Sequence, residues 1–145
     1  MRLFLSHASR DRDVARDLQR AVVRAFQLIG TQVEIFDAQS GIAASVPWEA
    51  ALAKAIESSE AMLILWTPHS LRASGQLIEI GAGWVLRKPL LPILYNCSLG
   101  ELDPVILTRR QAIEWRDFIE APVRHLDIAV RSGLGRIGSG TMDVG

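Results

Sequence analysis

Short apolar segments alternate along the chain with longer stretches whose apolar residues recur every three or four positions. The short segments are rich in leucine, isoleucine and aromatic residues and predict strands. They are apolar throughout and are separated by single helical stretches, which is typical of a parallel sheet covered by helices on both faces. We therefore expect an α/β protein with a flavodoxin-like, doubly wound sheet of five mainly parallel strands. The predicted strands are residues 2–6, 32–36, 61–66, 90–95 and 111–115.

The longer stretches have the spacing of amphipathic helices. Ser9 is a candidate N-cap for the first helix and Gly30 a candidate stop signal, while Pro47 suits the first turn of the second helix. The irregular region 96–110 has room for a short helix near residues 103–107. The predicted helices cover residues 9–30, 48–59, 70–84 and 117–130.

The size and composition of the chain indicate one folded domain. Its 145 residues are 49% hydrophobic, which is enough for a single core. We assign residues 1–131 to this domain. Residues 132–145 contain five glycines and no periodic apolar face, so we expect a mobile tail or a linker toward a further domain.

Charge and hydropathy narrow the classes of partner. Sixteen basic residues balance sixteen acidic ones, so no global field attracts nucleic acid or an anionic membrane. An anionic ligand must therefore be bound locally. No apolar run approaches the ~20 residues of a membrane span, and the N-terminus becomes polar too early for a signal peptide. The single cysteine, Cys97, cannot form an internal disulfide. We expect a cytoplasmic protein with no nucleic-acid or membrane partner.

Glu79 stands out because it lies in an otherwise apolar helical segment. A charge in such a place is costly unless something uses it. Glycines inside a helix cost about 1 kcal/mol each relative to alanine and favour a close approach to the backbone. Two interpretations stay open: a ligand approaches beside Glu79, or the glycines pack tightly against a strand and Glu79 is solvated. Helical spacing places Leu77, Ile80, Trp84 and the stem of Lys88 on one face, and Arg72, Gly75, Gln76, Glu79, Ala82 and Gly83 on the other.

In doubly wound sheets, ligands bind at the carboxyl ends of the strands. His7 at this edge suits a phosphate or ribose contact, and equally a helix cap. Arg72 suits a diphosphate, and equally solvent. Glu79 is close enough along its helix to line the same crevice. The residues expected at the edge are 6–9, 37–46, 67–70 and 96–98.

Several other side chains have a structural interpretation beside a functional one. Trp48 and Trp66 suit stacking on a base, but both occupy positions typical of a core, as does Trp84. Cys97 has no histidine and acid nearby in sequence, which argues against a nucleophile. We expect no metal, since the three histidines lack ligand spacing, and the sequence contains no glycine-rich phosphate loop.

Four segments in register resemble the Toll/interleukin-1 receptor (TIR) domain of the bacterial type, over residues 2–115. The resemblance implies a flavodoxin-like fold, and many such domains cleave the bond between nicotinamide and ribose in NAD. It also implies a cytoplasmic role in immune or anti-phage signalling. The segments are FLSHASRDRDVARDL, VEIFDAQSGI, WEAALAKAIESSEAMLILWTPHSL and EIGAGWVLRKPLLPIL.

The resemblance implies roles for residues of this chain. Glu79 falls on the catalytic glutamate of the family, and residues 37–46 fall on its BB loop, a self-association element. Many members have an aromatic residue where this chain has Gly75, so stacking would come from Trp48 or Trp66. The predicted substrate contacts are Ser6, His7, Ala8, Arg10, Asp37, Trp48 and Gly75, and the predicted interface residues are Gln39, Gly41 and Ile42.

The chemistry of NAD cleavage suits one carboxylate. Nicotinamide is already a good leaving group, so a carboxylate facing the oxocarbenium-like transition state supplies much of the stabilisation. Water as nucleophile gives hydrolysis and the adenine ring gives cyclisation, and both stay open. NAD is then a substrate, and no cofactor is expected. The alternatives are a TIR interaction module without activity and, more distantly, an enzyme resembling nucleoside deoxyribosyltransferases.

Overall fold

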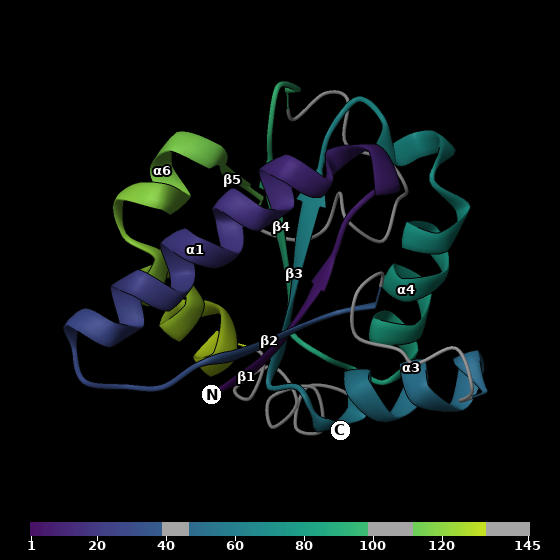
Figure 1. The fold of residues 1–145 in the computed structure, drawn as a ribbon, viewed down its shortest axis with the longest axis horizontal. Coiled ribbons are helices and arrows are strands. Elements are labelled where there is room, and N and C mark those ends of the chain that lie inside the picture. Colours follow the sequence, from purple (N-terminus) through teal and green to yellow (C-terminus); the bar gives the residue numbers. More distant parts are fainter. Residues whose placement is uncertain (39–46, 99–111, 133–145) are drawn as a thin grey trace, which may run out of the picture.

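Five parallel strands form one sheet in the computed structural model, which describes residues 1–38, 47–98 and 112–132 (Figure 1). The strand order is β2-β1-β3-β4-β5, and every neighbouring pair is parallel. The expected α/β sheet is confirmed, with boundaries that differ from the predicted ones by at most two residues. The strands are β1 (Arg2–Ser6), β2 (Glu34–Asp37), β3 (Ala61–Trp66), β4 (Leu90–Leu94) and β5 (Ile113–Glu114).

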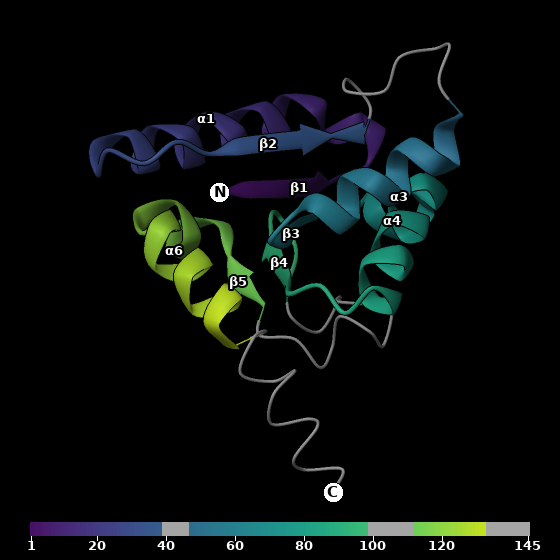
Figure 2. The same ribbon diagram turned by 90° about the horizontal axis from the view of Figure 1, so that it is seen from below.

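Helices cover both faces of the sheet (Figures 1 and 2). Side chains alternate along β1, so Leu3 and Leu5 belong to the core on one face and Phe4 to the core on the other. The first face packs under α1 (Arg12–Leu28) and α6 (Trp115–Glu120), and the second under α3 (Trp48–Ser58) and α4 (Ser74–Val85). Two short 3-10 helices, η1 (Ser9–Asp11) and η2 (Ser70–Arg72), precede α1 and α4.

The ends of the helices differ in part from the sequence expectations. Ser9 is not an N-cap: it opens η1, and α1 begins at Arg12. Gly30 does end the first helix, with a φ of 73° that glycine adopts without a steric penalty. The single helix expected over 117–130 is divided at Ala121, because a residue before proline disfavours helical backbone. Residues 122–132 form a separate helix.

The burial of the tryptophans differs in part from the prediction. Trp66 is fully buried in β3, as expected for a core residue. Trp84 is 51% exposed and Trp48 is 40% exposed, so the prediction of core positions for both was wrong. Trp48 is the first residue of α3, whose buried contacts begin only at Leu52. In α4 the buried stripe is instead Gln76, Glu79, Ile80 and Gly83.

The chain leaves two adjacent strands toward opposite faces of the sheet. After β1 it enters α1 on one face, and after β3 it enters α4 on the other (Figure 1). Connections that diverge in this way open a crevice at the carboxyl ends of the two strands, where ligands of such folds bind. The short helix expected near 103–107 and the tail from 133 lie outside the described residues.

Candidate functional site

Glu79 lies at the end of β1, on the buried face of α4. The side chain of Ser6 follows Phe4 in the alternation along β1 and points toward α4, where its hydroxyl donates a hydrogen bond of 2.7 Å to Glu79 Oε1. Glu79 is 6% exposed and is the only charged residue in α4. Its second oxygen, Oε2, accepts no hydrogen bond from any residue the structure describes. The solvated glutamate of the packing interpretation is therefore wrong.

Burial changes the protonation of this carboxyl. It raises the pKa of Glu79 from an ordinary 4.5 to about 7, because the charged form loses its hydration. The Ser6 hydrogen bond and the charge of His7 act in the opposite direction, and the charge of Asp37 adds to the increase. Glu79 therefore changes its charge close to neutral pH, which is a property of groups that take part in acid-base or electrostatic catalysis.

The buried His7 pairs with the partly buried Asp37, which lies at the end of the neighbouring strand β2. His7 Nε2 lies 2.7 Å from Asp37 Oδ2, and Nδ1 lies 2.6 Å from the carbonyl oxygen of Ala8. Both ring nitrogens face acceptors, so the imidazolium, which donates at both positions, fits this environment. The pKa of His7 is raised: burial lowers it, but the bonds to Asp37 and Ala8 and the charges of Asp37 and Glu79 outweigh that effect.

Gln76 holds α4 against the sheet one turn before Glu79. Its Nε2 donates to the carbonyl oxygens of Leu65, at 2.9 Å, and Ser6, at 3.3 Å, which belong to neighbouring strands. Its Oε1 is buried and has no partner within the described part of the chain. Helical spacing predicts Gln76 on the face of Glu79 but indicates no role for it. A polar residue one turn before the acid on an apolar helix was the available signal.

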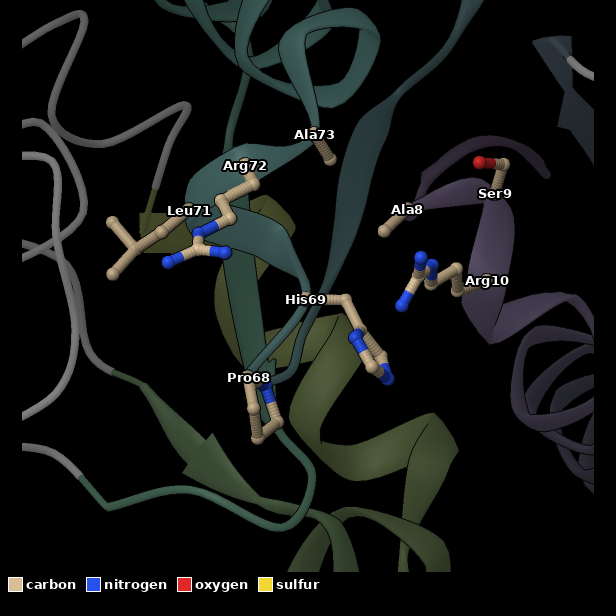
Figure 3. A pocket seen from close by; sticks show the side chains of 8 residues that line it. All are labelled: Ala8, Ser9, Arg10, Pro68, His69, Leu71, Arg72 and Ala73. Atoms are coloured by element: carbon tan, nitrogen blue, oxygen red, sulfur yellow. The ribbon is translucent and has the colours of Figure 1, made fainter.

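A cleft of about 500 Å³ opens between the connections that follow β1 and β3 (Figure 3). Arg10 projects from one side and Arg72 stands on the other, with the ring of His69 between the two walls (Figure 3). Neither arginine forms an ion pair with a residue in ranges 1–38, 47–98 or 112–132. Two such cations around one hollow suit a phosphate-bearing ligand. The lining residues are Ala8, Ser9, Arg10, Pro68, His69, Leu71, Arg72 and Ala73.

A second buried carboxylate braces this cleft. Asp11 at the end of η1 accepts a hydrogen bond of 2.5 Å from the Thr67 hydroxyl, and its other oxygen lies 3.9 Å from His69 Nε2. Thr67 Oγ1 also accepts a bond from the backbone N–H of His69. These contacts fix the connection after β1 to the connection after β3. The sequence around Asp11 suits the first turn of a helix and does not indicate this brace.

The predicted site residues fall into four groups. Ser6, His7, Asp37 and Glu79 come together, and Ala8 and Arg10 line the cleft. Trp48 does not line the cleft, and Gly75 faces open space. The interface residues Gln39, Gly41 and Ile42 lie outside the described residues.

The interpretation that glycines of α4 allow a ligand to approach does not hold for Gly83. A Cβ on Gly83 would lie 2.6 Å from Met62 Cε and 3.1 Å from Leu90 Cδ2, so this glycine serves close packing of α4 on the sheet. A Cβ on Gly75 meets no heavy atom within 4 Å. Space for a side chain is therefore available at Gly75 and filled by protein at Gly83.

Within the described ranges, no three histidine, cysteine or acidic side chains are arranged to bind a metal ion. No helix in those ranges is long and apolar enough to cross a bilayer.

The fold and the site agree with one protein family. A family model for the TIR domain matches residues 3–127. Because this match covers most of the chain, the protein belongs to the TIR domain family. The resemblance found in the sequence is thereby confirmed, while the bacterial subtype stays a prediction. No curated protein sequence matches the chain at a significant level.

Solved structures with a similar fold include TIR domains and an enzyme. The TIR domain of the Toll-related receptor TRR-2 from Hydra magnipapillata has a TM-score of 0.66 at 19% identity, over 89% of this chain and 97% of that one. A 2-deoxyribosyltransferase from Bacillus psychrosaccharolyticus has a TM-score of 0.58 at 16% identity, over 87% and 96%. The TIR domains of the activated Roq1 resistosome have a TM-score of 0.55 at 14% identity, over 95% and 83%. Likeness at this identity supports the fold alone.

Proposed function

We propose that this TIR domain cleaves the bond between nicotinamide and ribose in NAD, with Glu79 as the catalytic carboxylate. The observation that carries the proposal is the state of Glu79: it is buried, it titrates near neutral pH, and it has one oxygen without a protein partner in the described ranges. A carboxylate of this kind at the ligand-binding edge of the sheet suits stabilisation of a cationic transition state.

The reaction needs little acid-base chemistry. As the bond from ribose C1 to the nicotinamide nitrogen breaks, its electron pair moves to that nitrogen and cancels the positive charge of the ring. Positive charge develops on the ribose, and the Glu79 carboxylate stabilises it. Water then attacks C1 and loses a proton, which gives ADP-ribose, or an adenine nitrogen attacks and gives a cyclic product. Because only the ionised form of Glu79 helps, the rate rises with pH through about 7.

The cleft between the connections after β1 and β3, whose lining does not include Glu79, supports a dinucleotide substrate. Arg10 and Arg72 line its two sides and suit the two phosphates that join the halves of NAD. A nucleoside without phosphates would leave both arginines without an anion. This charge pattern favours NAD cleavage over exchange of bases on deoxynucleosides.

Chromatography of NAD incubated with concentrated purified protein tests the proposal directly. We expect release of nicotinamide, and we expect Glu79→Gln, a change of nearly equal volume, to abolish it while the melting temperature is maintained. Unchanged turnover by the Gln variant would refute the role of Glu79. No nicotinamide from the unaltered protein would favour the interaction module, and base exchange on deoxynucleosides would identify the deoxyribosyltransferase-like alternative.

We also propose that activity depends on self-association or association with another TIR domain through residues 37–46. The segment contains Gly41, Ile42 and small residues, a composition that suits a partner contact. If the loop of one molecule completes the site of a neighbour, Ile42→Asp and Glu79→Ala are each inactive alone but recover part of the activity when mixed. Specific activity also rises with protein concentration. A weak contact dissociates over roughly a hundredfold dilution. Specific activity that stays constant over such a dilution, with no recovery in the mixture, would refute this arrangement.

The biological setting follows from the same proposal. Consumption of NAD in the cytoplasm suits a protein of immune or anti-phage signalling. Measurement of cellular NAD after expression of the unaltered protein and of Glu79→Gln tests this role. Equal NAD levels in the two strains would argue against it.

A further inference from the structure

We propose that His7 is a positioning residue whose imidazolium, with Asp37 as its counter-ion, keeps Glu79 in the charged form that the reaction uses. The inference rests on the proposed function. It replaces the expected role of His7 as a contact for ribose or phosphate with an electrostatic role inside the protein.

The geometry of His7 carries the proposal. Its side chain is 1% exposed, and each ring nitrogen already lies within 2.7 Å of a protein oxygen. The Ala8 carbonyl oxygen can only accept, so Nδ1 carries a proton. An aspartate ionises at much lower pH than a histidine, so Asp37 accepts from a protonated Nε2. The ring is therefore a cation, and both of its donors are engaged by the protein.

The surroundings of Glu79 leave His7 as the cation that acts on it. Among the described elements, α4 has no other charged residue, and β3 and β4 have none. The charged residues of α3 are exposed. Asp11 on η1 is engaged by Thr67, and Arg72 on η2 is exposed toward the cleft. His7 directly follows Ser6, whose hydroxyl donates to Glu79 Oε1, and the charge of His7 lowers the pKa of Glu79 while that of Asp37 raises it.

His7 and Asp37, at the ends of two neighbouring strands, have different effects on Glu79. Burial alone would keep Glu79 protonated at neutral pH. The protonated carboxyl carries no charge and could not stabilise a cationic ribose. The His7 charge partly reverses this effect without touching the substrate. Asp37 acts one step further away, since its carboxylate keeps His7 protonated.

Titration of the Glu79 carboxyl by carbon-13 NMR tests the proposal without any substrate, so a failure of the proposed function would not affect it. We compare the unaltered protein with His7→Gln, which removes the charge but retains polar contacts. We expect the Glu79 titration to move upward by about one pH unit, as for loss of an opposite charge that favours the ionised carboxyl. Glu34→Gln is the control, because Glu34 lies at the far, exposed end of the strand that carries Asp37.

Asp37→Asn provides a second variant with its own signal. Nitrogen-15 shifts of the His7 ring are expected to show both nitrogens protonated at pH 7 in the unaltered protein, and a neutral ring in this variant. In activity assays, His7→Gln is expected to lose about tenfold in kcat at acidic pH and to recover at alkaline pH. An unchanged Glu79 titration in His7→Gln, or a neutral His7 ring in the unaltered protein, would overturn the inference.

Discussion

Glu79 and Asp11 are two buried carboxylates at the same edge of the sheet, and each is 6% exposed. Each also accepts a hydrogen bond from a hydroxyl at the end of a strand, Ser6 for Glu79 and Thr67 for Asp11. They differ in the second oxygen. That of Asp11 faces His69, whereas that of Glu79 meets no hydrogen-bond donor among the described residues. Asp11 therefore contacts two residues of the connection after β3 and joins two segments, whereas the second oxygen of Glu79 can meet a substrate.

The largest expected effect separates the two acids by function. Glu79→Gln should abolish detectable turnover, a fall in kcat of at least about 10²–10³, as for loss of a group that stabilises transition-state charge, without any loss of stability. Asp11→Ala should lower the free energy of unfolding by about 1–3 kcal/mol, since the buried Thr67 hydroxyl loses its acceptor, and should retain most of its activity. Kinetics and urea unfolding on both variants measure the contrast. If the two variants exchanged these phenotypes, the comparison would be reversed.

The pH dependence of stability is the next effect in size. The folded-state pKa of Glu79 is about 7, against 4.5 when exposed, so between these values the folded protein binds more protons than the unfolded chain. Stability therefore falls as pH rises through this window, by about 3 kcal/mol for a shift of this size. His7, whose pKa is also raised, contributes a slope of the same sign. Urea unfolding at about pH 5 and about pH 8 should show a smaller fall in Glu79→Gln. Equal falls would mean that Glu79 is not shifted.

Two glycines of α4 extend the comparison along one helix. Gly75→Leu should block activity and maintain or increase stability, because its side chain enters open space beside the acid and favours helix. Gly83→Ala should cost about 1–3 kcal/mol of stability, because its Cβ meets Met62 and Leu90. Melting curves and NAD turnover on both variants are the measurement. Early melting of Gly75→Leu would assign that glycine to packing.

The smallest effect concerns the wall of the cleft. Arg72→Ala should raise KM for NAD by about tenfold with kcat little changed, as for loss of a phosphate contact that is equal in the ground and transition states. Nicotinamide mononucleotide, which lacks the second phosphate, should be affected less. Arg87→Ala, beyond the end of α4 and outside the cleft, is the control. An unchanged KM would leave Arg72 in the solvated role.

The strands of the sheet could be predicted well because each one is specified by residues that are close together in the sequence. Continuous apolar segments such as 61–66 specify buried parallel strands by composition alone, and glycine and proline mark their limits. Glu79 could be assigned to the site because it is a charged residue in an otherwise apolar helix. The brace between Asp11 and Thr67 joins residues 56 positions apart, so nothing in local sequence indicates it. The orientation of α4 was predicted in part wrongly, since polar Gln76 and Glu79 lie on its buried stripe and Trp84 does not.

Because the chain diverges after β1 and β3, the residues that line the cleft are different from those that determine the fold of the sheet. The cleft is formed by two short connections, 8–10 and 68–73, whereas strand register depends on residues beneath them. Substitutions in these connections can change what is bound while the sheet stays the same. A receptor TIR domain and a 2-deoxyribosyltransferase share this scaffold at below 20% identity to the chain. Exchange of the two connections is thus a short route by which such a fold acquires a new ligand in evolution.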